Sequence, residues 1–289
     1  MSILSLFGKK PKFPLGHGKV VCISGCQDNQ TAGDALDVLK FFDIGKLLQG
    51  PQSQTSAAGG ACTAAMMDIM YHPGGAGDPA AYKETLAGFL SSLRKKLADA
   101  KNKDGKQVFT QVPQLSSTHQ LDLSEKILPL IKNPAAKRTK ALLIGIAYDN
   151  KSSIHLNGSH NDVKKQKQLI LTLGFTDTPE TMKVLLDDGD KATLDPTKKN
   201  IENGLKWLVQ DASPGDSLFL HYSGHGDEVR TVSRHEMPAK GCTGQRLLFC
   251  FLLSRVVCLC RLKRKWPAPN LTLRCCHPSP HSGPGCQRG

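Results

Sequence analysis

The sequence has no apolar run long enough to cross a bilayer. Its longest run of mostly apolar residues, 247–260, has 14 residues and contains Arg255, whereas a transmembrane helix needs about 18 or more. Residues 1–10 hold neither a long apolar core nor a small-residue cleavage site, so no secretory signal is predicted. We expect a cytoplasmic protein that does not engage a membrane.

Cysteine is scarce in the first part of the chain, and acidic residues are scarce in the last. Only three of the ten cysteines precede residue 230, whereas residues 230–289 hold seven. The same segment has 11 Lys and Arg against one acid, Glu236, and so carries +10 of the net charge of +13. The charge of the whole chain is therefore no argument that its body binds nucleic acid. The clustered cysteines lack the paired spacing of a zinc site, and a reducing compartment argues against structural disulfides.

What the chain does contain is ordinary globular composition. Its 289 residues are 39% hydrophobic and 22% charged, which excludes collagen-like, coiled-coil and wholly disordered chains. The length suffices for one large domain or two small ones.

The first half predicts a mixture of strands and helices. Residues 19–24 are a short apolar run that indicates a buried strand, followed by a polar loop over 24–31. We expect ligands at that end of the strand, as in open α/β sheets. Helices are predicted over 61–71 and from Asp78-Pro79 to Leu97, and an edge strand within 107–116.

The second half alternates regularly between strand and helix until Val229. This order favours right-handed crossovers and a parallel sheet with helices on both faces. The predicted elements are strands at 141–147, 182–186 and 217–222, and helices at 161–173 and from Pro196 to Val209. The pattern ends at Val229, and two interpretations stay open: a frame change or retained intron in the gene, or a genuine basic appendage.

One histidine stands out by its position. His225 follows the strand at 217–222 and lies between Gly224 and Gly226. Flanking glycines let the backbone turn sharply and approach a ligand. A histidine at such a place can act as general base for a nucleophile on a neighbouring strand end, although a loop histidine without a catalytic role fits the same pattern.

Four motifs together resemble the large-subunit region of metacaspases. They occur in the family's order and cover roughly 140–229. They are Lys-Ala-Leu-Leu-Ile-Gly-Ile (140–146), Leu-Asn-Gly-Ser-His-Asn-Asp-Val (156–163), Pro-Thr-Lys-Lys-Asn-Ile (196–201) and Asp-Ser-Leu-Phe-Leu-His-Tyr-Ser-Gly-His-Gly (216–226).

The first half resembles the small-subunit segment of the same family, at residues 21–35, 60–63 and 111–117. In most metacaspases that segment follows the large subunit, whereas here it comes first, as in the type III metacaspases of algae. Exchanged order is physically tolerable because neighbours in a sheet need not be neighbours in sequence.

The resemblance and the composition together define five segments. The divisions are a flexible lead (1–18), a small-subunit-like region (19–123), a linker (124–139), a large-subunit-like region (140–229) and a basic, cysteine-rich, poorly ordered tail (230–289). The fold implied is a caspase-like α/β sandwich of three layers, with a mostly parallel sheet.

The activity implied is that of a cysteine endopeptidase that cleaves peptides or proteins after Arg or Lys. By motif match His225 is the base and Gly226 is an oxyanion-hole candidate. The resemblance places Asp162, Asp28 and Asp34 around the basic side chain of the substrate, where a carboxylate would make a charge-assisted contact. An acid at a helix N-terminus, complementing the dipole, is the other interpretation of Asp162.

The family's nucleophile motif is missing. The nearest string is Arg274-Cys275-Cys276-His277-Pro278, in which Cys276 stands 51 residues after His225, close to the spacing seen in caspases. Arg274 replaces the expected acid and Pro278 interrupts the motif. Cys276 is the candidate nucleophile, and Cys26 is a weaker one.

Calcium is implied by the resemblance as a cofactor, but no ligands are identifiable in the sequence. Clustered carboxylates would be needed, and Asp187, Asp188 and Asp190 also fit a solvated loop after a strand. We expect a monomer.

Two other functions remain open from the sequence. One is a catalytically inactive caspase-fold protein that acts by binding. The other, nucleic-acid binding through the basic tail, is disfavoured.

Overall fold

The computed structural model describes residues 18–27, 30–44, 57–71, 82–131, 135, 138–149, 153–190, 193–226 and 256–262. Within these ranges, no helix is both long and apolar enough to span a membrane.

The elements, in chain order, are β1 (Gly18–Ser24), β2 (Asp34–Ala35), the short 3-10 helix η2 (Val38–Lys40), β3 (Gly59–Gly60), α1 (Ala61–Tyr71), α2 (Leu86–Asp99), β4 (Gln114–Ser117), α3 (Leu128–Ile131), β5 (Thr139–Gly145), α4 (Ser159–Thr172), β6 (Met182–Leu186), α5 (Lys198–Val209), β7 (Ser217–Ser223) and β8 (Val256–Leu262).

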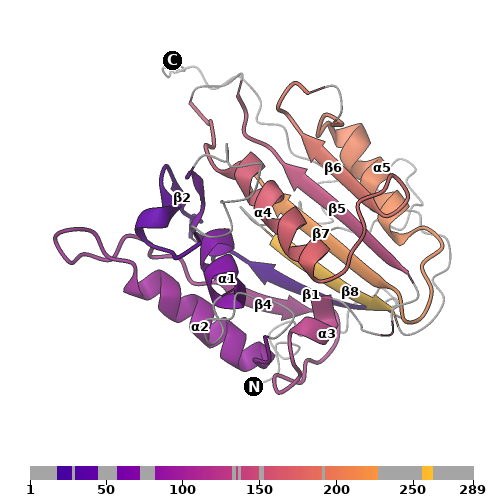
Figure 1. Cartoon of the computed structure of the whole chain (residues 1–289), viewed down its shortest axis with the longest axis horizontal. Helices are drawn as coiled ribbons and strands as arrows, with labels where there is room; N and C mark the ends of the chain where they lie inside the picture. The colour runs from indigo at the N-terminus through magenta and orange to yellow at the C-terminus, as the bar shows by residue number, and fades with distance from the viewer. Residues whose placement is uncertain are drawn as a thin grey trace, which may run out of the picture.

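A sheet of six strands runs through the described part of the molecule in the order β4-β1-β8-β7-β5-β6 (Figure 1). Strand β5 pairs parallel with both β6 and β7, whereas β8 pairs antiparallel with both β7 and β1. Strand β1 therefore runs in the same direction as β5, β6 and β7. The predicted edge strand is β4, which pairs antiparallel with β1 at one end of the sheet.

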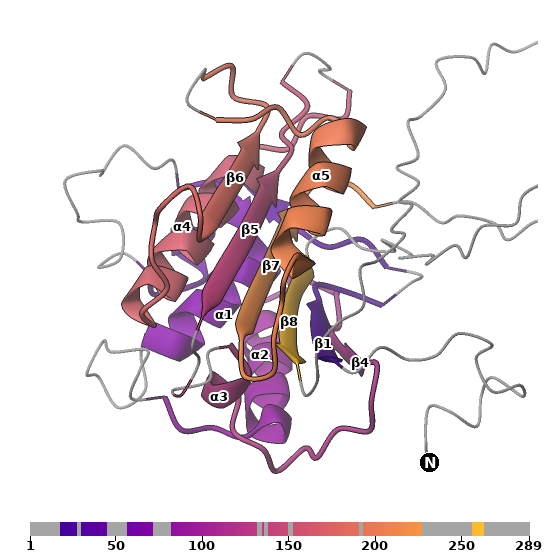
Figure 2. The same ribbon diagram turned by 90° about the vertical axis from the view of Figure 1, so that its right-hand side faces the viewer.

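Helices cover both faces of the sheet, as Figure 2 shows, with α1, α2 and α4 on one face and α5 on the other. The alternation of side chains along β5 explains how both faces are buried. Ala141 and Leu143 belong to the core shared with α1, α2 and α4, whereas Leu142 and Ile144 belong to the core under α5. The three-layer α/β sandwich expected from the sequence is confirmed.

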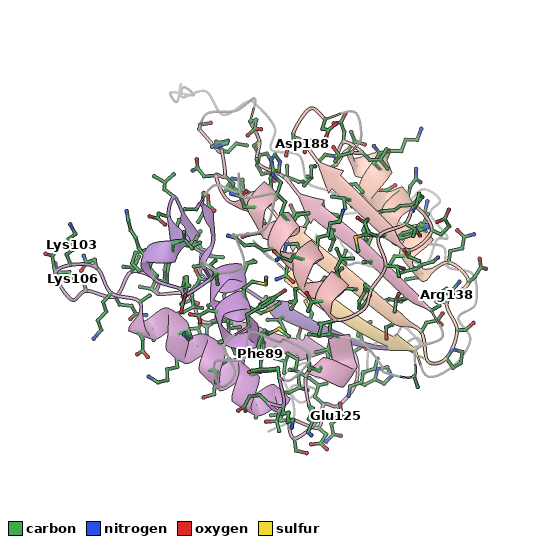
Figure 3. The ribbon with its side chains drawn as sticks, viewed as in Figure 1. Phe89, Lys103, Lys106, Glu125, Arg138 and Asp188 are labelled. Carbon is green, nitrogen blue, oxygen red and sulfur yellow. The ribbon has the colours of Figure 1, made fainter. Side chains whose placement is uncertain are left out.

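The start of the second helix differs from the prediction. Helix α2 begins at Leu86, where the side chain of Thr85 accepts a hydrogen bond from the backbone N–H of Gly88. The predicted N-cap, Asp78, lies outside the described residues, and Tyr82 precedes the helix although it is buried. Threonine at this position satisfies one of the first free N–H groups, so the helix starts there rather than at the acid and proline. Figure 3 shows Phe89 pointing inward from α2.

The predicted linker and tail both contain regular structure. Helix α3 lies within 124–139 and brings Ile127 and Ile131 into the main core, so this segment packs rather than merely connects. Strand β8 lies within 230–289 and occupies the middle of the sheet. Residues 256–262 form this strand because the β-compatible run there pairs with a strand on each side.

Leu143→Ala is predicted to lower the free energy of unfolding by about 2–5 kcal/mol, since it leaves a cavity at a fully buried position between β5 and the helices of the main core. Urea titration followed by circular dichroism measures the change. Leu171→Ala on α4, where the side chain is 37% exposed, is the control and should change stability by about 0.5 kcal/mol or less. Equal effects of the two variants would contradict the burial assigned to β5.

Candidate active site

The carboxyl ends of four strands meet at one edge of the sheet. Gly145 of β5 pairs with Leu186 of β6 and with Ser223 of β7. Ser24 of β1 and Tyr222 of β7 both pair with the same residue of β8, Val256. The loops that follow β1, β5, β6 and β7 therefore begin at this common edge, which is where α/β sheets bind ligands.

His225 lies at this edge, exposed to solvent and held by two neighbours in the loop between β5 and α4. Its Nε2 lies 2.6 Å from the backbone carbonyl oxygen of Ile154, and its ring centroid lies 4.9 Å from that of Tyr148. The backbone N–H of His225 also donates to the Tyr148 hydroxyl at 3.3 Å. The histidine is thus exposed, but both its ring and its backbone are restrained.

The bond to Ile154 fixes which ring nitrogen can act as a base. A carbonyl oxygen only accepts hydrogen bonds, so the hydrogen of the neutral imidazole must sit on Nε2. The other nitrogen, Nδ1, then has its lone pair available to take a proton. This is the arrangement that a general base requires.

Tyr148 adopts an unusual backbone conformation. Its φ is 60°, and it is one of two non-glycine residues with positive φ in the described part of the chain, the other being Asp211. A non-glycine residue in this region costs about 1–2 kcal/mol. The Asp187 carboxylate offsets that cost, since its two oxygens accept from the consecutive N–H groups of Ala147 and Tyr148, each at 2.8 Å.

Asp187 follows β6 and also accepts a hydrogen bond from His160 in the first turn of α4, with 2.6 Å between Nε2 and Oδ1. Partial burial would by itself raise the pKa of the Asp187 carboxyl. The bonds from the Ala147 N–H, from His160 and from the Tyr148 N–H outweigh burial and lower that pKa below its ordinary value of 3.8. Asp187 is thus an ionised anchor for the loop that carries Tyr148.

Asp162 lies in the first turn of α4 and is fully buried. One carboxylate oxygen accepts from the backbone N–H of Gly60 at 2.8 Å, and the other from the Ser223 hydroxyl at 2.9 Å. Ser223 ends β7, two residues before His225. Asp162 therefore joins the first half of the chain to the strand that carries the histidine.

Asp34 is half-buried and approaches the same helix end from the small β2–β3 sheet, visible beside the end of α4 in Figure 1. It pairs with Gly60 in the strand register, and its carboxylate accepts from the backbone N–H of Asn157 at 2.8 Å. A Cβ at Gly158 would lie 2.5 Å from an Asp34 oxygen and equally close to the Cα of Gly59. Only glycine at 158 permits this close approach.

The structure thus brings His225, Asp162 and Asp34 to one edge of the sheet. Gly226, the oxyanion-hole candidate, is exposed beside the histidine. Asp28 and Cys276 lie outside the described residues. The thiol of Cys26, which is buried, donates to the backbone carbonyl oxygen of Gln30 at 3.1 Å.

Strand β8 contains two further cysteines, Cys258 and Cys260, and neither lies at the edge of the sheet where His225 is found. In the backbone register, Cys258 stands opposite Leu220 and Cys260 opposite Leu218. Both positions lie well inside the sheet.

The sequence analysis did not single out Tyr148 or Ser223, and it considered Asp187 only as part of an acidic cluster. All three belong to loops or strand ends on the carboxyl side of strands that the sequence did predict. The rule that placed His225 at the sheet edge would have placed them there too. Their contacts depend on strand register, which one sequence does not reveal.

Other parts of the described structure offer no competing centre. No group of three or more His, Cys, Asp or Glu in the described ranges is arranged to hold a metal ion. Calcium ligands are therefore not found among these residues. Asp188 lies at the end of β6 (Figure 3) and accepts from the Thr193 hydroxyl and the Asp190 N–H, as in a solvated loop.

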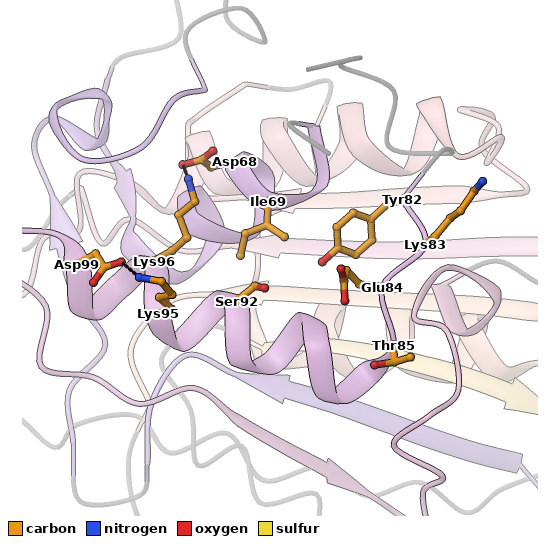
Figure 4. A pocket seen from close by; sticks show the side chains of 10 residues that line it. All are labelled: Asp68, Ile69, Tyr82, Lys83, Glu84, Thr85, Ser92, Lys95, Lys96 and Asp99. Carbon is orange, nitrogen blue, oxygen red and sulfur yellow. Dashed lines mark hydrogen bonds and ion pairs between the residues drawn. The ribbon is translucent and has the colours of Figure 1, made fainter. Parts of the chain in front are cut away.

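A cavity of about 660 Å³ lies between α1 and α2 (Figure 4). None of its lining residues is a predicted site residue. Its charged groups include the ion pairs Lys96–Asp68 at 2.7 Å and Lys95–Asp99 at 2.5 Å, so we assign no chemistry to it.

Comparison with known proteins gives one consistent result. Residues 139–242 match the family model described as metacaspase, peptidase C14 domain. "Metacaspase III c" of Phaeodactylum tricornutum is 35% identical over 215 residues, which is 74% of this chain and 57% of that protein. "Metacaspase-1" of Eremothecium gossypii is 47% identical over 105 residues, or 36% of this chain and 23% of that protein. "Metacaspase-1A" of Aspergillus niger is 48% identical over 99 residues, or 34% and 24%. The chain thus spans little more than half of the first relative and about a quarter of the other two.

Asp187→Asn should remove part of the acid sensitivity of the fold. Because the folded-state pKa of Asp187 is depressed, its ionised form contributes stability above the ordinary pKa of 3.8, and that stability is lost as the pH falls through the folded-state value. Urea midpoints measured between pH 2 and pH 7 should fall less steeply in acid for Asp187→Asn than for the unmodified chain. The exposed Asp195, changed to Asn, is the control, and identical acid slopes in all three proteins would contradict the prediction.

Proposed function

The chain belongs to the metacaspase family, and from that premise we propose that it is a cysteine endopeptidase of the C14 type that acts on peptide or protein substrates. The observation that carries the proposal is the state of His225. Its Nε2 is committed to the Ile154 carbonyl, and its Nδ1 is left to accept a proton at the open edge of the sheet. A cysteine protease needs such a base.

The proposed reaction uses His225 twice. Nδ1 takes the proton of the cysteine thiol, and the thiolate attacks the carbonyl carbon of the scissile peptide bond. Backbone N–H groups, with that of Gly226 as candidate, stabilise the negative oxygen of the tetrahedral intermediate. The protonated imidazole then gives its proton to the departing amine, and water hydrolyses the thioester that remains.

We propose Cys276 as the nucleophile. The chain reaches the sheet in β8, directly beside β7, and leaves it at Leu262. The 14 residues from Leu262 to Cys276 extend up to about 46 Å, whereas β7 is about 23 Å long. The segment is therefore long enough to return to the edge where His225 lies.

We propose that substrates carry Arg or Lys before the cleaved bond, and that Asp34 and Asp162 recognise that side chain, with Asp28 in support. Asp162 is buried and has both oxygens engaged, so a guanidinium would have to replace the Ser223 hydroxyl at one of them. Asp34 is half-buried and lies at the same helix end. Two carboxylates at one helix end favour a cationic side chain over a neutral one.

Calcium stays a prediction of the family resemblance, and no step is derived through it. Hard cations need several oxygen ligands, and the described residues do not supply such a set. Location in the cytoplasm and a monomeric state are likewise proposals.

His225→Ala and Cys276→Ser are each predicted to abolish hydrolysis of a fluorogenic peptide with Arg before the scissile bond, because each removes one partner of the proton transfer. Rates should fall by about 10³-fold or more. The assay is run with added calcium and with a chelator, so that a requirement for the ion is measured at the same time.

Matched controls separate chemistry from folding. His119→Ala changes an exposed histidine after β4, and Cys275→Ser changes the residue next to the proposed nucleophile; both should retain activity. Loss of activity in Cys275→Ser with full activity in Cys276→Ser would show that Cys275, and not Cys276, is the nucleophile. Well-folded unmodified protein without activity in either buffer would contradict the peptidase proposal.

Asp34→Asn is predicted to lower kcat/KM for the Arg peptide by about 10- to 100-fold, which corresponds to the loss of a hydrogen bond to a charged group. The amide oxygen still accepts from the Asn157 N–H, so the helix end keeps its contact. The comparison peptide has Gln in place of Arg and should be affected little. Asp177→Asn, at the other end of α4, is the control; an equal loss on both peptides would show that Asp34 acts on structure and not on specificity.

A further inference from the structure

We infer that Tyr148 is a positioning residue for His225, and that Asp187 sets this position through the backbone of Tyr148. The inference rests on the proposed function, since it names what holds the base of that reaction in place. Neither residue is proposed to touch the substrate.

The first step is that the ring of His225 needs a further contact to fix its orientation. His225 is exposed and follows Gly224, so neither burial nor its own backbone fixes the direction of its ring. Its Nε2 bonds to one carbonyl, which leaves the ring free to rotate about that bond. A base must be held close to one orientation, because an error of about 1 Å can cost 10²-fold in rate.

The second step is that Tyr148 supplies this restraint at two points. Its ring lies beside the imidazole, with 4.9 Å between the centroids and 42° between the planes. Its hydroxyl accepts from the backbone N–H of His225 at 3.3 Å. The hydroxyl of Tyr222 also donates to the backbone carbonyl oxygen of His225 at 2.9 Å. The backbone of His225 is therefore bonded on both sides, and its ring is packed against one face.

The third step is that Tyr148 presents its ring to His225 from a left-handed backbone. The φ of 60° is disfavoured for tyrosine. Asp187 holds it there, with one carboxylate oxygen on the N–H of Ala147 and the other on the N–H of Tyr148. His160 in turn fixes one oxygen of Asp187. The chain of contacts is continuous from α4 through the end of β6 to the ring of His225.

The described residues on both sides of this loop make further contacts that hold it in place. The Leu156 N–H donates to the Ala147 carbonyl oxygen at 2.8 Å, and His155 pairs with Asp149 at 3.2 Å. Ile154, which supplies the acceptor for His225, lies between these contacts in sequence. One loop therefore carries both groups that orient the histidine ring.

The test compares two substitutions at position 148. Tyr148→Asn removes the ring while keeping a residue that tolerates a left-handed backbone, and kcat should fall about 10- to 100-fold with KM changed less than threefold. Tyr148→Phe keeps the ring and should restore most of the rate.

A second readout does not need activity. Nitrogen-15 NMR of the histidine rings, assigned by the signal lost in His225→Ala, reports which nitrogen of His225 carries the hydrogen. We expect the Nε2–H form in the unmodified chain and a mixture of both tautomers in Tyr148→Asn. Unchanged ring signals together with an unchanged kcat in Tyr148→Asn would overturn the inference. If the unmodified chain is inactive, but its histidine tautomer still changes as expected in Tyr148→Asn, the result contradicts the peptidase proposal and leaves the positioning role of Tyr148 intact.

Asp187→Asn tests the second link. It should lower kcat in the same direction as Tyr148→Asn, and the two effects should not add in the double variant, because both act through one contact. Asp188→Asn is the matched control, since among the described residues the neighbouring carboxylate bonds to Thr193 and Asp190 and not to the β5–α4 loop. Additive effects, or an equal effect of Asp188→Asn, would show that Asp187 does not act through Tyr148.

Discussion

The parallel register of β5 with β6 and β7 is the constraint on which the rest of the site depends. It aligns Gly145, Leu186 and Ser223, so the residues that follow them start from one line across the sheet. The register itself is held by burial on both faces, because successive side chains of β5 enter two different cores. A slip by one residue would exchange those cores and separate Asp187 from the loop it holds.

The features that burial and helix periodicity impose were predictable from the sequence. The strand at 182–186 and the helix over 198–209 lie where the pattern put them, because their apolar spacing matches the faces they bury. His225 was found by its place after a strand and between glycines. The contacts around it were not predictable, since the left-handed turn at Tyr148 follows from a carboxylate on another strand and leaves no mark in the local sequence.

Two segments contain regular structure that their composition does not indicate, and the physical reason is the same for both. The run at 256–262 and the helix at 128–131 both lie in regions whose composition resembles linker or tail. Each contributes a few residues that find partners far away in sequence: β8 pairs with β1 and β7, and Ile131 enters the main core. The average composition of a long segment does not reveal such a short stretch, whereas about five residues are enough to form a strand of a sheet.

The placement of β8 also bears on how the two halves of the chain make one site. Strands β1 and β7 come from different halves, run parallel and are joined in the sheet through β8. Asp162 adds a second link, since it bonds to Gly60 from one half and to Ser223 from the other. Chain order does not enter these contacts. Because β8 runs antiparallel to β7, its own carboxyl end lies at the edge of the sheet away from His225. Cys276, the proposed nucleophile, comes 14 residues after Leu262, so the proposal requires the chain after β8 to turn back along the sheet towards His225.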